Sequence, residues 1–188
     1  MTWPAPVTLK GKHVTLAPLA LEHAKGLSNA ARNLGPLWYT SIPDPDAMEE
    51  EINKRNATLG MTPFVQMTPD GRPVGMTTYM HSTETDRRVE IGSTWIAPEV
   101  QRGKFNTEAK LLLLTHAFET LGCIRVEFRT HRMNHQSRRA IERLGAQLEG
   151  ILRNHMVMAD GHLRDTAVYA IIENEWPVIK THLQAKLT

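Results

Sequence analysis

The stretch that decides the fold is Val89-Glu90-Ile91-Gly92-Ser93-Thr94-Trp95-Ile96-Ala97-Pro98, followed by Gln101-Arg102-Gly103-Lys104-Phe105-Asn106-Thr107-Glu108-Ala109-Lys110. It reads as a strand, a polar turn with two cations and a glycine, and then a helix. This layout presents backbone N–H groups and a helix N-terminus to an anion. A solvated basic turn before an ordinary helix would give the same pattern, so the loop alone leaves both interpretations open.

The residues before this stretch predict a hairpin-like opening with a first strand over 13–17, helices over 19–33 and 47–59, and strands over 62–67 and 73–81. Asp46 is expected to cap the second of these helices. The deciding stretch itself predicts a strand over 89–96 and a helix over 106–121, with Asn106 as its N-cap and Gly122 as its stop.

The residues after it predict a strand over 123–130, a short helix over 134–144, strands over 147–158 and 163–172, and a final helix from about Glu173. Asp160-Gly161 between the last two strands is a strong hairpin signal. A strand, a helix and a strand in succession predict a right-handed parallel crossover. We therefore expect residues 1–188 to form one α+β domain, with a mixed, mostly antiparallel central sheet, one parallel β-α-β crossover and flanking helices.

The composition is that of a globular protein, with 41% hydrophobic and 22% charged residues. A net charge of +2 does not demand nucleic acid as a partner. The single cysteine, Cys123, excludes an internal disulfide and fits a reducing compartment. The first residues lack a signal-peptide pattern, and the longest aliphatic run, 111–114, is too short to cross a bilayer. We expect a cytoplasmic protein with no membrane partner.

Several short motifs share one order and spacing with a known family. They are Glu90-Ile91-Gly92, Trp95-Ile96, residues 101–110, Asn134-His135-Gln136-Ser137, Ile141-Glu142-Arg143-Leu144-Gly145, Glu149-Gly150, Arg153, and Arg164-Asp165 through Tyr169. Through them the chain resembles the GCN5-related N-acetyltransferase (GNAT) superfamily, and more closely its ribosomal-protein N-terminal acetyltransferase-like branch. The resemblance implies acetyl-CoA as acyl donor and a primary amine as acceptor: a peptide N-terminus, an amino acid or a small amine. It also implies a homodimer.

The resemblance implies a set of coenzyme-binding residues: Trp95, Ile96, Gln101, Arg102, Gly103, Lys104, Phe105, Asn106, Asn134 and Ser137. Backbone N–H groups around Trp95 and Ile96 would face the thioester carbonyl. The family places small residues where this chain has Lys104 and Asn106, so its pyrophosphate loop departs from the usual pattern. Lys104 could instead pair with a phosphate. Arg143 belongs to a group of arginines around the short helix, where a 3′-phosphate could lie, although a solvated helix face is the favoured interpretation for most of them.

Glu90 and Ser137 are the candidate catalytic residues. Glu90 could take a proton from the amine, directly or through water, and the alternative is a strand carboxylate paired with Arg87 or Arg88. Ser137 would lie near the coenzyme sulfur, as the resemblance implies, or would be a polar residue in the first turn of a helix. The tyrosine acid of many family members is absent, because Ile141 holds its position.

Trp38 and Tyr39, in a proline-bounded loop, could line an acceptor pocket or plug a minor core. His131 and His135 are four residues apart, but no third ligand is suggested, so we expect no metal. Asp165 and Glu149 are expected to be cross-strand partners of Arg153 or Arg164. Two functions follow: an acyl-CoA-dependent N-acetyltransferase with direct attack by the amine, or a non-catalytic coenzyme-A-binding sensor or partner module.

Overall fold

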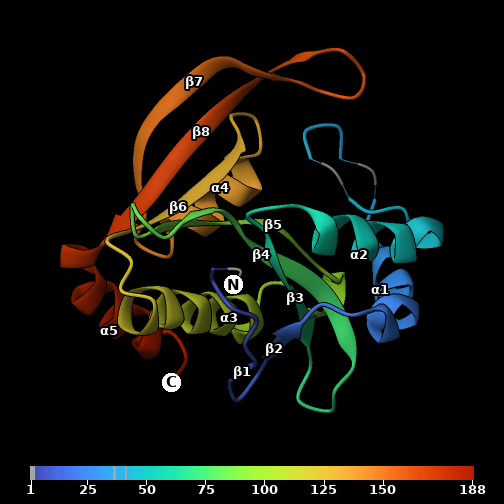
Figure 1. The fold of residues 1–188 in the computed structure, drawn as a ribbon, viewed down its shortest axis with the longest axis horizontal. Coiled ribbons are helices and arrows are strands. Elements are labelled where there is room, and N and C mark those ends of the chain that lie inside the picture. Colours follow the sequence, from blue (N-terminus) through green and yellow to red (C-terminus); the bar gives the residue numbers. More distant parts are fainter. Residues whose placement is uncertain (1–2, 36, 41) are drawn as a thin grey trace.

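The protein, analysed as a computed structural model, is described at residues 3–35, 37–40 and 42–188. Within these ranges one sheet has the strand order β1-β2-β3-β4-β5-β6-β8-β7 (Figure 1). The strands are β1 (Leu9–Lys10), β2 (Thr15–Pro18), β3 (Thr62–Met67), β4 (Pro73–Thr83), β5 (Arg88–Ile96), β6 (Arg125–His131), β7 (Gln147–Val157) and β8 (Leu163–Ile172). Only β5 and β6 pair in parallel, which confirms the predicted mixed sheet.

The described α-helices are α1 (Ala24–Ala31), α2 (Met48–Ala57), α3 (Lys104–Thr115), α4 (His135–Glu142) and α5 (Trp176–Ala185). Figure 1 shows α3 and α5 on one side of the sheet and α2 on the other. Leu27 of α1 and Ile52 of α2 are fully buried, as are Leu113 of α3 and Leu183 of α5. The helices therefore cover both faces of the sheet with apolar side chains.

Two predicted helix caps are wrong. Asp44 caps the turn before α2, because its side chain accepts a hydrogen bond from the backbone N–H of Asp46 at 2.9 Å. The Asp46 side chain instead pairs with Arg32. The helix α3 begins at Lys104, with Gly103 as N-cap, so Asn106 lies inside its first turn. An earlier start brings the helix N-terminus directly onto the basic loop.

The parallel strands β5 and β6 separate soon after they meet. They pair only at Arg88–Arg125, Val89–Val126 and Glu90–Glu127. Beyond Glu127, β6 continues along β8, while β5 continues along β4. The sheet therefore opens into a splay whose apex is at Glu90, and α3 begins just after the open end of β5.

A bulge in β5 lies along this splay. Ser93 has φ 48° and, with Thr94, stands opposite the single residue Thr77 of β4. The buried Arg55 of α2 donates hydrogen bonds to the Ser93 carbonyl at 3.2 Å and to Thr78 Oγ1 at 3.3 Å. The bulge is thus held from the α2 side of the sheet.

A second buried cation contacts the bulge from the opposite face. Lys110 Nζ of α3 lies 2.9 Å from Thr94 Oγ1 and 3.2 Å from Thr77 Oγ1. The two threonine hydroxyls also lie 2.8 Å apart. Burial lowers the pKa of Lys110 to about 7. Among the described residues no carboxylate forms a salt bridge with it.

The orientation of α3 depends on one buried carboxylate. Glu108 accepts hydrogen bonds from the backbone N–H groups of Lys12 at 2.9 Å, His13 at 2.5 Å and Val14 at 3.0 Å. Its side chain fills the space beside Gly11, where an added Cβ would lie 2.5 Å from it. Glu108 therefore fastens α3 to the turn between β1 and β2.

Replacing Glu108 with alanine is expected to lower the free energy of unfolding by about 3 kcal/mol or more, because three backbone donors lose their acceptor. Chemical denaturation with urea measures the loss. Glu108→Gln is the matched control, and it should lose less because its amide oxygen still accepts. An alanine variant as stable as the wild type would contradict this role.

Candidate active site

The N-terminus of α3 forms the floor of a cavity of about 300 Å³. Its described lining is rich in cations and contains no carboxylate: Arg102, Gly103, Lys104, Thr107, Arg143 and Lys186. Free backbone N–H groups and the partial positive charge of a helix N-terminus add to these charges. The cavity is therefore suited to an anion with several negative charges, such as a group of phosphates.

The glycine of the loop before α3 is not the residue that takes a positive φ. Arg102, and not Gly103, adopts a positive φ, at 62°, whereas Gly103 has φ −109°. Gln101 Nε2 donates to the carbonyl of Ile96 at 3.0 Å, which fastens the loop to the end of β5. Phe105 is buried in the core and Asn106 Oδ1 is buried without a hydrogen-bond partner among the described residues. The cavity therefore presents Arg102 and Lys104 from this loop.

Lys104 extends toward the C-terminal segment. Its Nζ donates hydrogen bonds to the carbonyls of Leu187 at 2.8 Å and Thr188 at 3.0 Å. This contact brings Lys186, which follows α5, to the same cavity. A lysine at the position where the family has a small residue thus links two segments around the anion cavity.

Glu90 lies at the apex of the splay with its side chain 7% exposed. Among the described residues its partners are not Arg87 or Arg88, the pairing that we considered. His81 Nδ1 lies 2.9 Å from Glu90 Oε2 and donates to it, and Arg129 Nε lies 3.5 Å from the same oxygen. His81 is itself exposed, so the partner of this buried carboxylate reaches solvent.

Asn134 is the N-cap of α4, because its Oδ1 accepts from the backbone N–H of Ser137 at 2.9 Å. Ser137 is half-buried in the first turn of α4. The Asn134 side chain therefore stabilises the start of α4. This capping does not remove a coenzyme contact, since a carboxamide also carries two donor hydrogens.

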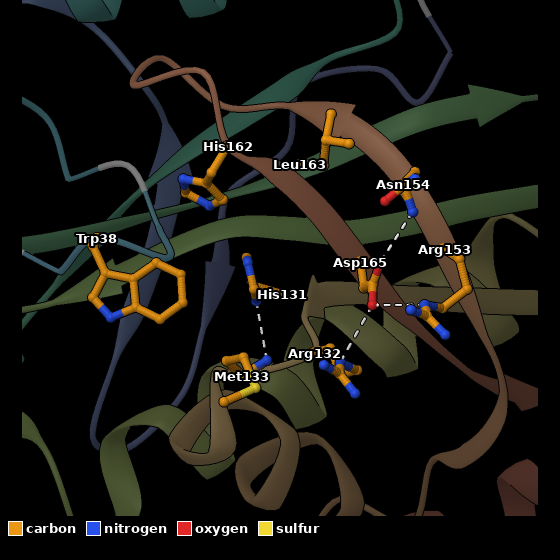
Figure 2. Close-up of a pocket in the computed structure, with 9 residues that line it drawn as sticks. All are labelled: Trp38, His131, Arg132, Met133, Arg153, Asn154, His162, Leu163 and Asp165. Atoms are coloured by element: carbon orange, nitrogen blue, oxygen red, sulfur yellow. Dashed lines mark hydrogen bonds and ion pairs between the residues drawn. The ribbon is translucent and has the colours of Figure 1, made fainter.

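Trp38 reaches a second cavity, of about 610 Å³, near the end of β6 (Figure 2). The other lining residues come from the end of β6 and from the β7–β8 hairpin: His131, Arg132, Met133, Arg153, Asn154, His162, Leu163 and Asp165. Trp38 packs edge-to-face against Tyr39, with ring centroids 5.3 Å apart. Of the predicted aromatic pair, only Trp38 lines the cavity, and Tyr39 packs against Trp38.

Neighbouring charges hold the β7–β8 hairpin in shape. Asp165 accepts from Arg153 Nε at 2.8 Å and from the backbone N–H of Asn154 at 2.9 Å, and it pairs with Arg132 at 3.4 Å. The predicted Asp165–Arg153 contact is therefore confirmed. Glu149 was placed wrongly, because it pairs with Arg125 of β6 across the sheet and not with Arg153 or Arg164.

Other observations bear on the chemistry. Burial raises the pKa of Cys123 to about 11, so this thiol is not activated as a nucleophile. In the described part of the chain, no cluster of three His, Cys, Asp or Glu side chains could hold a metal. None of the described helices has the length and apolar character needed to span a membrane.

Comparison with known proteins identifies the family. The family model described as the acetyltransferase (GNAT) domain matches residues 13–147, which include the splay and the basic loop. The chain belongs to the GNAT acetyltransferase family. This membership confirms the resemblance inferred from the motifs, and the acyl-CoA-dependent N-acyltransferase class expected for the chain agrees with it.

Relatives with sequence or structural similarity agree with this GNAT assignment. The putative ribosomal N-acetyltransferase YdaF of Bacillus subtilis is 34% identical over 107 residues, which cover 57% of each protein. The match thus spans little more than half the length of that relative. A GCN5-related N-acetyltransferase from Brucella melitensis superposes with a TM-score of 0.89 at 31% identity, over 98% of this chain and 87% of that one.

Mycobacterium smegmatis RimJ in complex with CoA-disulfide superposes with a TM-score of 0.77, over 98% of this chain and 97% of that one. At 24% identity this likeness shows the GNAT fold alone. The superpositions on RimJ and on the Brucella structure each cover 98% of this chain, so both span nearly the whole sheet. The α+β prediction is therefore confirmed as a GNAT fold.

Sequence reasoning missed several residues of this GNAT site. Lys186 and Thr107 join the anion cavity, and His81 joins Glu90. His131 was considered only as a metal ligand. The alternation of Glu127, Arg129 and His131 along one strand was a usable signal, because it places all three on the face that carries Glu90.

Proposed function

We propose that residues 1–188 act as one acyl-CoA N-acyltransferase domain that transfers an acetyl group from acetyl-CoA to a primary amine by direct attack. The acceptor is a peptide N-terminus, an amino acid or a small amine, and the name of YdaF favours a ribosomal protein. The protein acts in the cytoplasm as a homodimer, without a metal, nucleic acid or membrane partner.

One observation carries this proposal: the two strands that separate beyond Glu90 each lead to a cavity, the anion cavity at the loop after β5 and the cavity bordered by Trp38 at the end of β6. Arg102, Lys104, Arg143 and Lys186 would hold the phosphates of the coenzyme. Its pantetheine arm would lie along β5 past Trp95 and Ile96, with Asn134 and Ser137 across the splay. RimJ, which has the same fold, is in complex with CoA-disulfide, and this supports coenzyme A as a ligand of this fold.

Bound acetyl-CoA supplies an activated thioester. Glu90 accepts the proton that the amine loses on attack, and its contacts with Arg129 and His81 orient the carboxylate. Backbone N–H groups around Trp95 and Ile96 stabilise the negative charge that develops on the carbonyl oxygen. Ser137 donates a hydrogen bond to the departing thiolate. Arg55 and Lys110 hold the β5 bulge from its two faces, which fixes these backbone donors.

Substitutions in the anion cavity test the coenzyme site. Changing both Arg102 and Arg143 to alanine is expected to weaken acetyl-CoA binding about 100-fold, because each charged contact contributes roughly 1.5 kcal/mol or more. Titration calorimetry measures the affinity. Arg32→Ala, an exposed arginine far from α3 in the chain, is the matched control and should bind as the wild type does. Unchanged affinity in the double variant would place the phosphates elsewhere.

A thiol-release assay tests the reaction over a panel of amines with acetyl-CoA. The proposed transferase releases coenzyme A only when a suitable amine is present. A sensor or partner module would bind acetyl-CoA and raise the melting temperature without turnover on any amine. Neither binding nor turnover would overturn both functions.

A further inference from the structure

His131 lies on the same face of the sheet as the proposed base. It is the last residue of β6, only 5% exposed, and side chains alternate along the strand from Glu127 through Arg129. Glu127 is the cross-strand partner of Glu90, and Arg129 contacts Glu90. His131 is four residues beyond Glu127, which is roughly 13 Å along β6. The Glu90 carboxylate leans along β5 toward Gly92, where an added Cβ would lie 3.0 Å from Oε1, and this shortens the span between the carboxylate and His131.

The hydrogen bond at Nδ1 decides which nitrogen of His131 carries its proton. The backbone N–H of Met133 donates to Nδ1 at 3.0 Å, so Nδ1 is an acceptor and the proton is on Nε2. Burial, and then the positive charge of Arg164, lowers the pKa of His131, so the ring is neutral at physiological pH. His131 therefore presents a neutral Nε2–H donor.

This donor lacks a partner within the part of the chain that the structure describes. Nε2 is buried and makes no hydrogen bond there. Figure 2 shows the imidazole directed toward the space between Trp38 and His162. The ring centroids of Trp38 and His162 lie 5.2 and 5.9 Å from that of His131. A buried donor without an acceptor is costly, which makes a ligand oxygen its natural partner.

The side chain that covers His131 is largely exposed to solvent. Trp38 is 58% exposed and lies in the loop between α1 and α2. It contacts His131 and His162 through edge-to-face arrangements, each worth roughly 1 kcal/mol. A ligand that hydrogen-bonds to Nε2 would displace the Trp38 indole. The flat face of the indole would then cover the bound ligand.

The charge of the cavity restricts the ligand further. Arg132 and Arg153 share the single carboxylate of Asp165 at its edge, so the described lining carries one excess positive charge. This balance opposes a polycation such as a polyamine. It favours an amine that also carries a carbonyl or carboxylate oxygen.

On this basis, and resting on the proposed transferase function, we infer that His131 is a specificity-determining residue whose Nε2–H binds a carbonyl or carboxylate oxygen adjacent to the acceptor amine. The acceptor class is therefore the amino-acid type, with a peptide N-terminus or a free amino acid as the two sources of that oxygen. Trp38 covers the bound group.

Three matched acceptors test the inference: trialanine, free alanine and isopropylamine, which lacks the oxygen. His131→Phe keeps a ring against Trp38 but removes the donor. It should raise KM for trialanine or alanine about 10-fold and leave kcat, acetyl-CoA affinity and the isopropylamine reaction unchanged. A rise in KM for trialanine would identify a peptide N-terminus as the source of the oxygen, and a rise for alanine would identify a free amino acid. His135→Phe, at an exposed position of α4, is the control.

The outcomes separate the two proposals. An equal effect of His131→Phe on all three acceptors, or none, overturns the inference and leaves the transferase function in place. If the wild type turns over no amine, quenching of tryptophan fluorescence by trialanine is measured in the presence of coenzyme A. Quenching that is lost in His131→Phe would then support the site while the transferase function fails. Absence of quenching in the wild type overturns the site.

Discussion

Replacing Glu90 with glutamine is expected to lower kcat for acetyl transfer about 100-fold or more, because the amide cannot take a proton from the attacking amine. The affinity for acetyl-CoA should not change, since Glu90 does not line the anion cavity. Steady-state thiol release gives kcat, and titration calorimetry gives the affinity.

The matched control for this change is Glu149→Gln. Glu149 is also a strand carboxylate paired with an arginine. Its partner, Arg125, is the first residue of β6 and lies away from the open end of the splay. We expect its kcat to stay close to that of the wild type. If the Glu90→Gln enzyme kept full kcat, Glu90 would not be the base. The amine would then lose its proton to water or attack without assistance from a base.

Replacing Lys110 with methionine is expected to stabilise the protein by a few kcal/mol at neutral pH, because it removes the cost of burying an ammonium group without a carboxylate partner. Thr77 and Thr94 remain hydrogen-bonded to each other, at 2.8 Å. The change should also alter how stability depends on pH.

The sign follows from the two states of the lysine. Its pKa is about 7 in the folded protein, against 10.5 for an ordinary lysine. Between these pH values the unfolded chain binds more protons, so this group makes stability rise by roughly 1 kcal/mol per pH unit from about pH 7 to pH 10. Urea denaturation across this range should show that slope in the wild type and lose it in Lys110→Met.

Lys25→Met, at an exposed position of α1, is the control and should keep the wild-type slope. A Lys110→Met protein that is less stable at pH 7, with the slope unchanged, would mean that Lys110 is charged and well paired. The activity of the variant is informative too. Loss of a contact on the β5 bulge should lower kcat more than acetyl-CoA affinity, because the bulge carries the backbone donors for the carbonyl.

The strand pattern was predictable because its signals are local. β3 begins and ends at the predicted residues, 62 and 67. The β7–β8 hairpin differs from the prediction by one residue, because Asp160-Gly161 specifies its turn. The parallel crossover followed from the order of strand, helix and strand alone.

The helix starts were less predictable. A side chain suited to capping does not fix the cap when another residue can take that place. Gly103 caps α3 three residues before Asn106, which moves the whole basic loop onto the helix N-terminus. Lys104 departs from the family's pattern of small residues, and in the structure it lines a cavity together with three other cations.

The remaining site residues depend on long-range contacts that no local pattern contains. Trp38 and His131 are far apart in the sequence and meet only because the α1–α2 loop reaches the end of β6. Lys110 lies among leucines on a helix that is apolar on several sides, so its burial against two strand threonines could not be read from periodicity. The Trp38–His131 contact and the burial of Lys110 both depend on which helices and loops cover the two faces of the sheet.

The most direct test of the account is to analyse both products of one reaction that contains the protein, acetyl-CoA and trialanine. Mass spectrometry of the peptide is combined with measurement of free coenzyme A. The account predicts one acetyl group on the peptide N-terminus for each thiol released, and almost none with Glu90→Gln. Thiol release without peptide acetylation, or bound acetyl-CoA that stays intact with every amine, would contradict it.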